Sequence, residues 1–489
     1  MKSIEKVDYK TRKVNLKPRI GVIGVGHYTY WEQFPGLLDE MYRKQEVLIE
    51  KIPDFVDVVD FGLIDDSEKA YLAVKSLESS GLDMLFCDMV TYATSGTIGI
   101  IFKSLNIPIV LIALQPLRGM DYSKASTYIQ LMNDDICSLP EFTGVALRMG
   151  IQIPDVIIGT LYDDPYADKQ INDFCRIAKV LHGLKNAQFG HIGHSLNSML
   201  DMNFDPTMVT AWFGCHIKHC EANQIVTCYT NVTDEEIENA KSIILAFFDT
   251  PDPVSDPIYI KLQDDDLYQA AKVYVALDKF IAEYKLTGLA YYYDGAENSQ
   301  ERQVMSNLTV GNSLLTAKNI PMCGESDIKT LLALFIMDRF GMGGSFAELH
   351  PVDFDGDFVL VGHDGPHNIS ISGGKPVIRS LKKYHGKPGS GAGVEFKIKT
   401  GPITILSINS TYDGRFKFVI AEGESCEGPI PPTGNTNTRA RFKPDVRSFI
   451  TKWVKEGPTH HFSLGVGHHA SSLVKIAGYL GIEAVVVTD

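Results

Sequence analysis

The 489-residue sequence lacks long apolar runs and paired cysteines. No stretch of 18 apolar residues occurs, which excludes a membrane-spanning helix of ordinary length. The first ten residues lack the apolar core of a secretory signal peptide. The eight cysteines include no Cys-x-x-Cys pair and no dense framework, so we expect reduced thiols. These absences predict a cytoplasmic protein.

Basic residues are also scarce. Lys and Arg number 46 against 60 Asp and Glu, which gives a formal net charge of −14. Binding to nucleic acid or to an anionic membrane needs a basic surface, so neither is an expected partner. The segment Gly21-x-x-Gly24-x-Gly26 is not the Gly-x-Gly-x-x-Gly of dinucleotide sites, and no Gly-Lys-Ser/Thr phosphate cradle occurs. We therefore expect a small uncharged substrate and no nucleotide cofactor.

The first 345 residues alternate between short apolar strands and helical segments. Strands are predicted at 19–26, 56–61, 84–87, 107–113, 156–158, 244–248 and 289–293, and helices at 35–50, 67–79, 169–184 and 328–340. This alternation is typical of parallel sheets covered by helices on both faces. Because so long a chain needs more than one core, we predict two Rossmann-like, doubly wound α/β domains at 1–165 and 166–345.

The pattern changes from residue 346 onward. Short, often alternating segments at 357–361, 394–399, 403–406 and 416–420 are separated by turn residues such as Asp413-Gly414. They predict a C-terminal antiparallel β-rich domain, barrel-like, at 346–489, ending in a helix at 471–480 and a strand near Val485. The loop 428–441, rich in Pro, Thr and Asn, is expected to be a mobile cover.

Four potential metal ligands stand beside Gly, Pro or Ser in this second half: Glu325, Glu348, His363 and His461. Gly and Pro mark the ends of strands and helices, and sites are usually built at such ends. Two carboxylates and two imidazoles suit a divalent ion such as Mn²⁺. The pattern therefore favours a metal site in the second half of the chain.

The residues alone leave alternatives open for each of these positions. Glu325 could serve only the start of the helix at 328–340, where a carboxylate favours the helix dipole, and Asp327 is expected to cap that helix or to be a further acceptor. Adjacent side chains point different ways, so normally one residue of a His pair ligates. The competing histidines are His350 beside Glu348, His367 four residues after His363, His460 beside His461, and the pair His468-His469.

The order of these motifs resembles the L-arabinose isomerase family, which is related in fold to the L-fucose isomerases. The matching segments are Gly324-Glu-Ser-Asp327, Gly343-Gly-Ser-Phe-Ala-Glu348, Gly362-His363, Gly401-Pro-Ile-Thr404, Glu422-Gly-Glu-Ser425 and Gly457-Pro-Thr-His-His461. The resemblance covers residues 320–489 and is thin before them. The interval of 23 residues from Glu325 to Glu348 is shorter than expected of the better-known arabinose isomerases, so the chain resembles a divergent member.

The resemblance implies a metal-dependent aldose–ketose isomerase, an intramolecular oxidoreductase. It implies Mn²⁺, with Co²⁺ or Mg²⁺ as alternatives, held by Glu325, Glu348, His363 and His461, with the two glutamates as the acid/base pair. The implied reaction is L-arabinose to L-ribulose, with D-galactose to D-tagatose as a side activity. L-fucose or D-arabinose are alternative substrates. A noncatalytic sugar-binding relative and a metal-dependent hydrolase or epimerase are alternatives of other classes.

The resemblance also implies sugar contacts and an assembly. Gln115 matches a family glutamine that contacts the sugar, and His27, Gln33, His367 and His460 are further candidates. Proteins of this family form homo-trimers or hexamers in which the N-terminal domain of a neighbour covers the site. The same arrangement is expected here.

Overall fold

The computed structural model describes residues 17–195, 199–252, 260–381, 391–431 and 435–488, together with the short strands at 383–384 and 387–388. The chain forms two compact units, Asn15–Gly183 and Leu184–Asp489, called here the N-terminal and C-terminal units. In the described part of the chain, no helix is long and apolar enough to cross a membrane.

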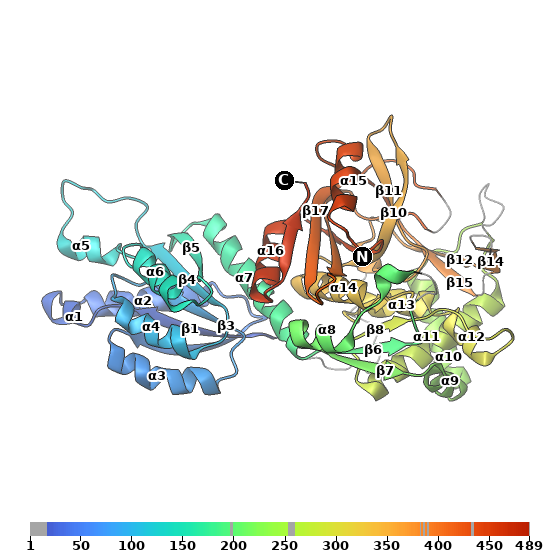
Figure 1. Ribbon diagram of the computed structural model, residues 1–489, viewed down its shortest axis with the longest axis horizontal. Coiled ribbons are helices and arrows are strands. Elements are labelled where there is room, and N and C mark those ends of the chain that lie inside the picture. The colour runs from blue at the N-terminus through green and yellow to red at the C-terminus, as the bar shows by residue number, and fades with distance from the viewer. Residues whose placement is uncertain are drawn as a thin grey trace. The chain divides into compact units, whose positions relative to one another are not determined.

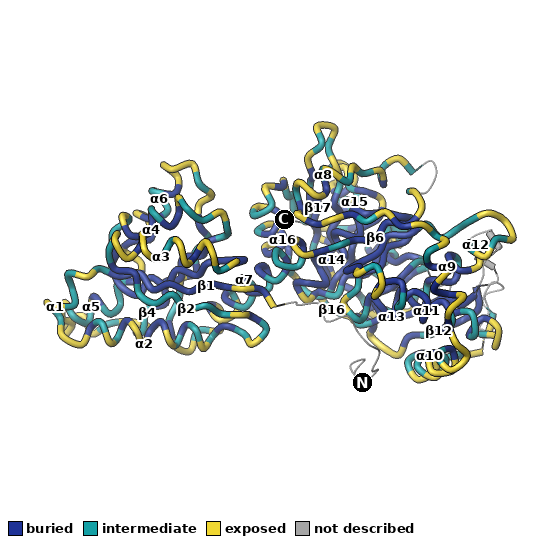
Figure 2. Tube along the Cα trace, turned by 90° about the horizontal axis from the view of Figure 1, so that it is seen from below, coloured by how far each residue is buried: buried dark blue, intermediate teal, exposed yellow. Residues whose placement is uncertain are grey.

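The N-terminal unit is a five-stranded parallel sheet with strand order β2-β1-β3-β4-β5. Helices α3, α4 and α6 cover one face, and α2 covers the other, with α5 packed against α2 (Figures 1 and 2). The strands are β1 (Arg19–Val25), β2 (Asp57–Ile64), β3 (Met84–Asp88), β4 (Ile109–Gln115) and β5 (Asp155–Thr160). The helices are α1 (Thr29–Gln33), α2 (Leu37–Glu50), α3 (Ser67–Ser79), α4 (Ser95–Ser104), α5 (Thr127–Met132), α6 (Leu139–Met149) and α7 (Pro165–Lys185).

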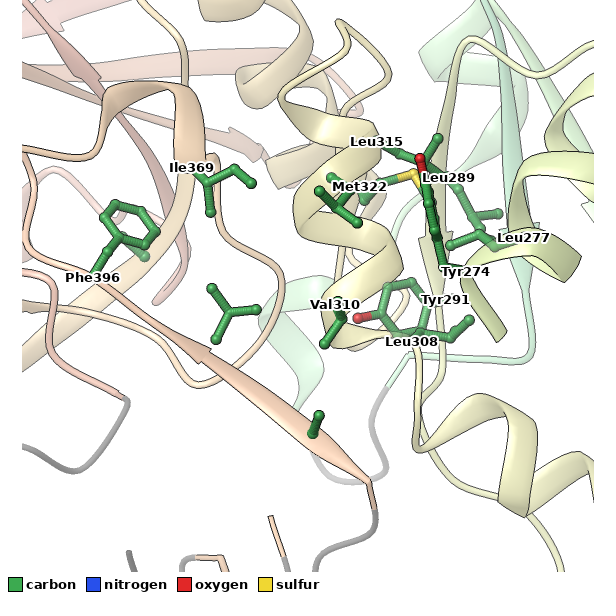
Figure 3. Close-up of a cluster of buried hydrophobic side chains, with 14 of the residues drawn as sticks. Tyr274, Leu277, Leu289, Tyr291, Leu308, Val310, Leu315, Met322, Ile369 and Phe396 are labelled. Carbon is green, nitrogen blue, oxygen red and sulfur yellow. The ribbon is translucent and has the colours of Figure 1, made fainter. Parts of the chain in front are cut away.

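The C-terminal unit begins with a four-stranded parallel sheet of order β7-β6-β8-β9 and its helices. Its strands are β6 (Gln188–Ile192), β7 (His216–Cys220), β8 (Gly288–Tyr291) and β9 (Met322–Cys323). Its helices are η2 (Leu200–Met202), α8 (Pro206–Phe213), α9 (Ala222–Thr230), α10 (Asp234–Phe247), α11 (Asp264–Tyr284), α12 (Gln300–Met305), α13 (Thr309–Thr316) and α14 (Ile328–Phe340). Tyr274 and Leu277 of α11 face Leu289 and Met322 of the sheet in the hydrophobic core (Figure 3).

A closed antiparallel barrel of six strands follows, in the order β16-β19-β10-β11-β18-β17, with β17 pairing back to β16. Its strands are β10 (Ser345–Asp353), β11 (Phe358–Gly362), β16 (Gly401–Ser410), β17 (Phe416–Cys426), β18 (Thr438–Phe442) and β19 (Phe462–Val466). Strand β20 (Glu483–Val486) adds in parallel to β17. The remaining elements are β12 (Val377–Ser380), β13 (Lys383–Tyr384), β14 (Lys387–Pro388), β15 (Ala392–Glu395), η3 (Ile369–Ile371), α15 (Val446–Lys455) and α16 (Ala470–Tyr479).

Helix α14 joins the parallel sheet to the barrel. All thirteen of its residues are buried, because it packs on β8 and β9 on one side and on β16 and β19 on the other. The Phe335 ring lies 5.0 Å from that of Phe189 in β6. A helix enclosed on all sides needs no polar face, which explains the apolar run of this segment.

The predicted fold class is confirmed: two parallel α/β sheets precede an antiparallel barrel. The predicted division at residues 165 and 345 stays a prediction. The strand predicted at 156–158 is part of β5, which pairs with β4 in the first sheet.

Two local predictions were wrong. The strand expected at 244–248 is the end of helix α10, because Thr233 and Glu236 form a capping box and Ile237, Ala240 and Ile244 line one buried helical face. The expected cover at 428–441 includes the start of barrel strand β18, whose Thr438, Ala440 and Phe442 alternate inward. Residues 432–434 of that loop lie outside the described residues.

Candidate metal-binding site

Glu325 lies in a tight turn between strand β9 and helix α14. Glu325 and Ser326 both adopt the left-handed backbone conformation, with φ of 58°, which non-glycine residues rarely do. Ser326 holds the turn against the sheet: its amide donates to the carbonyl of Tyr291 at 2.9 Å, and its hydroxyl donates to the carbonyl of Ile192 at 2.7 Å. Asp327 then caps α14 by accepting from the Thr330 amide at 3.0 Å.

The other three predicted ligands come from neighbouring strands of the barrel. Glu348 of β10 stands opposite Gly362 of β11, and His363 follows directly. His461 precedes Phe462 of β19, which pairs with Ala347 of β10. The register of three adjacent strands therefore brings Glu348, His363 and His461 together.

The structure places these side chains in two groups that share one residue. Potential ligand atoms of Glu348, His363 and His461 all lie within 4.8 Å of one another, and so do those of Glu325, His460 and His461. The Nε2 atom of His461 lies 3.7 Å from Oε2 of Glu325. The Phe346 ring packs against the rings of His363 and His461, with centroids 4.3 and 4.4 Å away.

Carboxylates orient both buried imidazoles. His461 Nδ1 lies 3.1 Å from Asp327 Oδ2, an arrangement that leaves Nε2 facing Glu325. His363 Nδ1 lies 3.1 Å from Asp364 Oδ1 and 2.9 Å from the amide nitrogen of Gly365. If Nδ1 carries the proton and donates to Asp364, Nε2 keeps a lone pair that can bind a metal. If Nδ1 instead accepts from Gly365, the proton is on Nε2. A bound metal would therefore select the tautomer with the proton on Nδ1.

Burial and charge act differently on the two imidazoles. Burial lowers the pKa of His461, and its hydrogen bond to Asp327 opposes this only in part. At His363, burial also acts to lower the pKa, but the hydrogen bond and charge of Asp364 together with the charge of Glu348 outweigh it and raise the pKa. A bound cation would compete with a proton at His363.

The residues fit a divalent cation. The Oε2 atom of Glu325 is buried and accepts no hydrogen bond from the described residues. A buried carboxylate oxygen without a donor is costly unless a cation or a ligand neutralises it. The surrounding oxygen and nitrogen donors are those that Mn²⁺ and similar ions accept.

Four other histidines are candidate ligands from the sequence, and each makes different contacts. His367 is fully buried, with its ring against Phe396 at 5.5 Å. His350 Nε2 lies 3.8 Å from Glu348 Oε1. His468 Nε2 lies 3.0 Å from the carbonyl of Gly423, and His469 packs on Phe340. None of these four belongs to a group of three potential ligands within the described residues.

The sugar-contact candidates of the first half lie in the N-terminal unit. His27 follows β1 and packs edge-on against Tyr30 and Tyr92, with ring centroids 5.3 and 6.1 Å away. Gln33 is exposed on α1, and Gln115 ends β4 with its amide donating to the Leu117 carbonyl at 2.6 Å. Their contact with a sugar stays a prediction.

Sequence reasoning missed three residues next to the site: Asp364, Asp201 and Lys329. Asp201 forms a hydrogen bond with His460, which is 259 positions away, and no sequence pattern predicts that contact. Lys329 carried a usable signal, because a lysine near the start of an apolar helix must either reach water or find buried acceptors. It does the second.

Known proteins match the C-terminal part of the chain and, more distantly, most of its length. Residues 376–488 match the family described as L-fucose isomerase, C-terminal domain. The L-arabinose isomerase of Nocardioides sp. (strain ATCC BAA-499 / JS614) is 22% identical over 393 residues, covering 78% of this chain and 76% of that protein. That of Cellvibrio japonicus (strain Ueda107) is also 22% identical, covering 79% and 76%. This chain is a distant homologue of the L-arabinose isomerases. A sulfoquinovose isomerase of Alkalicoccus urumqiensis is 21% identical over 313 residues, covering 62% of this chain and 65% of that protein.

Proposed function

We propose that the protein is a metal-dependent sugar isomerase that converts an aldose into the corresponding ketose. The observation that carries the proposal is the convergence of Glu325, Glu348 and His363 on His461, with a buried oxygen of Glu325 lacking a hydrogen-bond donor. The distant homology to L-arabinose isomerases supports the same class of reaction.

The proposed chemistry divides between the ion and the two glutamates. A divalent ion at this site, Mn²⁺ or alternatively Co²⁺ or Mg²⁺, would polarise the sugar carbonyl as a Lewis acid. Glu325 and Glu348 would act as the acid/base pair, one accepting a proton from the C1–C2 unit and the other donating one. They reach the site from different elements, the turn after β9 and strand β10.

The shell around these groups holds the imidazoles in place. With the ion bound, Asp327 and Asp364 would accept from the Nδ1 atoms of His461 and His363, which leaves the Nε2 atoms to bind the ion. The Phe346 ring covers both imidazoles and keeps water from that side. These residues would orient the imidazoles, and the glutamates would transfer the protons.

The proposed substrate is an uncharged monosaccharide. L-arabinose, giving L-ribulose, comes first, with D-galactose to D-tagatose as a side activity, because the L-arabinose isomerase relatives cover most of the chain. L-fucose and D-arabinose are the alternatives, and the match to a sulfoquinovose isomerase adds that anionic sugar to the test as the charged exception. We propose that the protein works as a homo-trimer or hexamer without a nucleotide cofactor.

The deciding experiment measures ketose formation by protein stripped with chelator and then resupplied with Mn²⁺. The panel contains L-arabinose, D-galactose, L-fucose, D-arabinose and sulfoquinovose. Conversion of one sugar that disappears with chelator and returns with Mn²⁺ supports the proposal and names the substrate. Conversion that continues without metal, or Mn²⁺ binding with no conversion, contradicts it; the second result would favour a noncatalytic sugar-binding protein.

A further inference from the structure

Lys329 is a buried lysine at the start of helix α14, beside the candidate site. The residue is 1% exposed, and its ammonium group donates to the backbone carbonyl of Asp201 and, at 2.9 Å, to the side-chain oxygen of Asn409. Burying a cation is costly unless acceptors and opposite charges compensate for the lost water, and the charges of Asp327 and Asp201 act here together with the two neutral acceptors. Lys329 also links helix α14 to the segments that contain Asp201 and Asn409.

Those segments converge on the loop that carries His460 and His461. Asn409, at the end of β16, binds both Lys329 and this loop, because its side-chain NH2 donates to the carbonyl of Gly457 at 2.8 Å. Two residues later the Thr459 amide donates to the Ser407 hydroxyl at 2.9 Å. The loop from Gly457 to His461 is therefore fixed to strand β16 at its beginning and at its middle.

Asp201 fixes the end of the same loop. Its Oδ2 atom accepts from the backbone amide of His460 at 3.0 Å and lies 2.6 Å from Nδ1 of the same residue. One carboxylate oxygen thus holds both the backbone and the ring of His460. Because Lys329 binds the backbone carbonyl of Asp201, the carboxylate is anchored to helix α14.

The held imidazole lies beside the candidate metal ligands. A ring nitrogen of His460 lies within 4.8 Å of potential ligand atoms of Glu325 and His461, and the two histidine rings are 3.8 Å apart. The side chain of His460 is 35% exposed, whereas that of His461 is 1% exposed. With Nδ1 engaged by Asp201, Nε2 is the nitrogen left for a molecule bound at the site.

We infer that Asp201 and Lys329 are positioning residues that hold His460 toward bound substrate, in a role separate from that of the buried His461. The substrate in this inference rests on the proposed function, whereas the hydrogen bonds that hold His460 do not. Asp201 fixes the ring and Lys329 fixes Asp201. Neither residue is expected to touch the ion.

The first test compares Asp201→Ala with Asp201→Asn. Both hydrogen bonds end on one oxygen, so an asparagine oxygen can accept both, whereas alanine accepts neither. Asp201→Ala is expected to lower kcat/KM by ~10- to 100-fold, mainly through KM, and Asp201→Asn is expected to restore most of it. Mn²⁺ affinity should stay near that of the unchanged protein in both variants.

Asp205→Ala is the matched control. Asp205 accepts from the amides of Thr207 and Met208 at the start of α8 and makes no contact with His460. Its loss removes two hydrogen bonds close by in the chain without moving the imidazole. Equal losses of activity in Asp205→Ala and Asp201→Ala would show a general structural effect and overturn the inference.

A second readout does not depend on activity. In full-length protein labelled with 15N-histidine, the signal of a proton on Nδ1 of His460, identified by its loss in His460→Gln, should be present in the unchanged protein and in Asp201→Asn. It should be lost in Asp201→Ala. Persistence in Asp201→Ala would overturn the positioning role. If no sugar is converted, the proposed function fails, while this comparison still decides whether Asp201 holds His460.

Lys329 is tested through its partner as well as directly. Lys329→Met leaves the carbonyl of Asp201 without its donor, and the same loss of the His460 signal is expected. Because a change in the centre of the C-terminal unit can prevent folding, Asn409→Ala provides the second variant. It breaks the link from Lys329 to Gly457 and is expected to raise KM severalfold. An unchanged KM and an unchanged His460 signal would overturn the role of Lys329.

Discussion

The Nδ1 atom of His461 lies 3.1 Å from Oδ2 of Asp327, and both side chains are almost completely buried. The same carboxylate caps helix α14. One aspartate thus starts the helix that joins the sheet to the barrel and orients an imidazole at the site. Its two tasks can be separated by experiment.

Asp327→Asn should weaken Mn²⁺ binding more than it weakens the fold. Asparagine is a good N-cap, so the helix start is retained, but the loss of charge weakens the hold on the His461 ring, and we expect ~10- to 100-fold lower metal affinity. Asp445→Asn is the control, since Asp445 caps α15 through Ser448 in the way that Asp327 caps α14 through Thr330. Equal metal affinity in the two variants, measured by calorimetric titration, would contradict this role.

The two glutamates should be needed for turnover rather than for folding. We expect Glu325→Gln and Glu348→Gln each to lower kcat by ~100- to 10,000-fold, since an amide cannot exchange a proton with the sugar. Far-ultraviolet circular dichroism should be unchanged. Glu238→Gln, on the exposed surface of α10, serves as the control. Full activity in either site variant would remove that residue from the acid/base pair.

Loss of an imidazole should be partly repaired by excess metal. His363→Ala and His461→Ala are expected to raise the Kd for Mn²⁺ by at least ~100-fold, more than loss of an outer partner does. Activity should recover in part as Mn²⁺ is raised. His468→Ala, which removes contacts with the Gly423 carbonyl and the Glu424 carboxylate, should bind the ion normally. If neither site variant changed the Kd, the ligand assignment would be wrong.

Asp88 in the N-terminal unit should make stability depend on pH. It is 3% exposed, and burial, opposed by the Lys44 charge, raises its pKa from 3.8 to about 7. Between these values the folded protein keeps a proton that the unfolded chain has lost, so stability falls as pH rises through the window. Asp88→Asn removes this dependence.

Urea denaturation of both proteins at several pH values measures the effect. The stability of Asp88→Asn relative to the unchanged protein should grow by ~2–4 kcal/mol from pH 4 to pH 7. Because only the change in stability with pH is compared, the pH-independent effect of the amide on stability cancels. Asp121→Asn, at an exposed position, should show no such growth. Parallel curves for Asp88→Asn and the unchanged protein would contradict the raised pKa.

Local pattern predicted much of the fold. The helices at 67–79 and 328–340 have the observed limits of α3 and α14, since Asp66 and Asp327 cap them and apolar residues fill their buried positions. The strand expected at 244–248 failed because a short apolar run fits a buried helix end as well as a strand. Capping at Thr233 decided between the two.

The site was less accessible to sequence reasoning than the fold. The four proposed ligands sit in short motifs next to glycine and proline, and the order of those motifs identified them. Asp201 and Asp364 gave no such signal. Their roles depend on which segments meet in space, as when η2 reaches His460 across 259 positions of sequence. Local pattern does not contain that information.

The proposed ligands come from both layers of the C-terminal unit, Glu325 from the turn after the parallel sheet and the other three from the barrel. An ion bound there would act as a cross-link between the two layers. Because an ion that binds only the folded state stabilises that state, the melting temperature would rise with ion concentration. At 100 times the Kd, the ion would stabilise the folded state by about 2.7 kcal/mol. Calorimetry could therefore detect occupancy without any sugar.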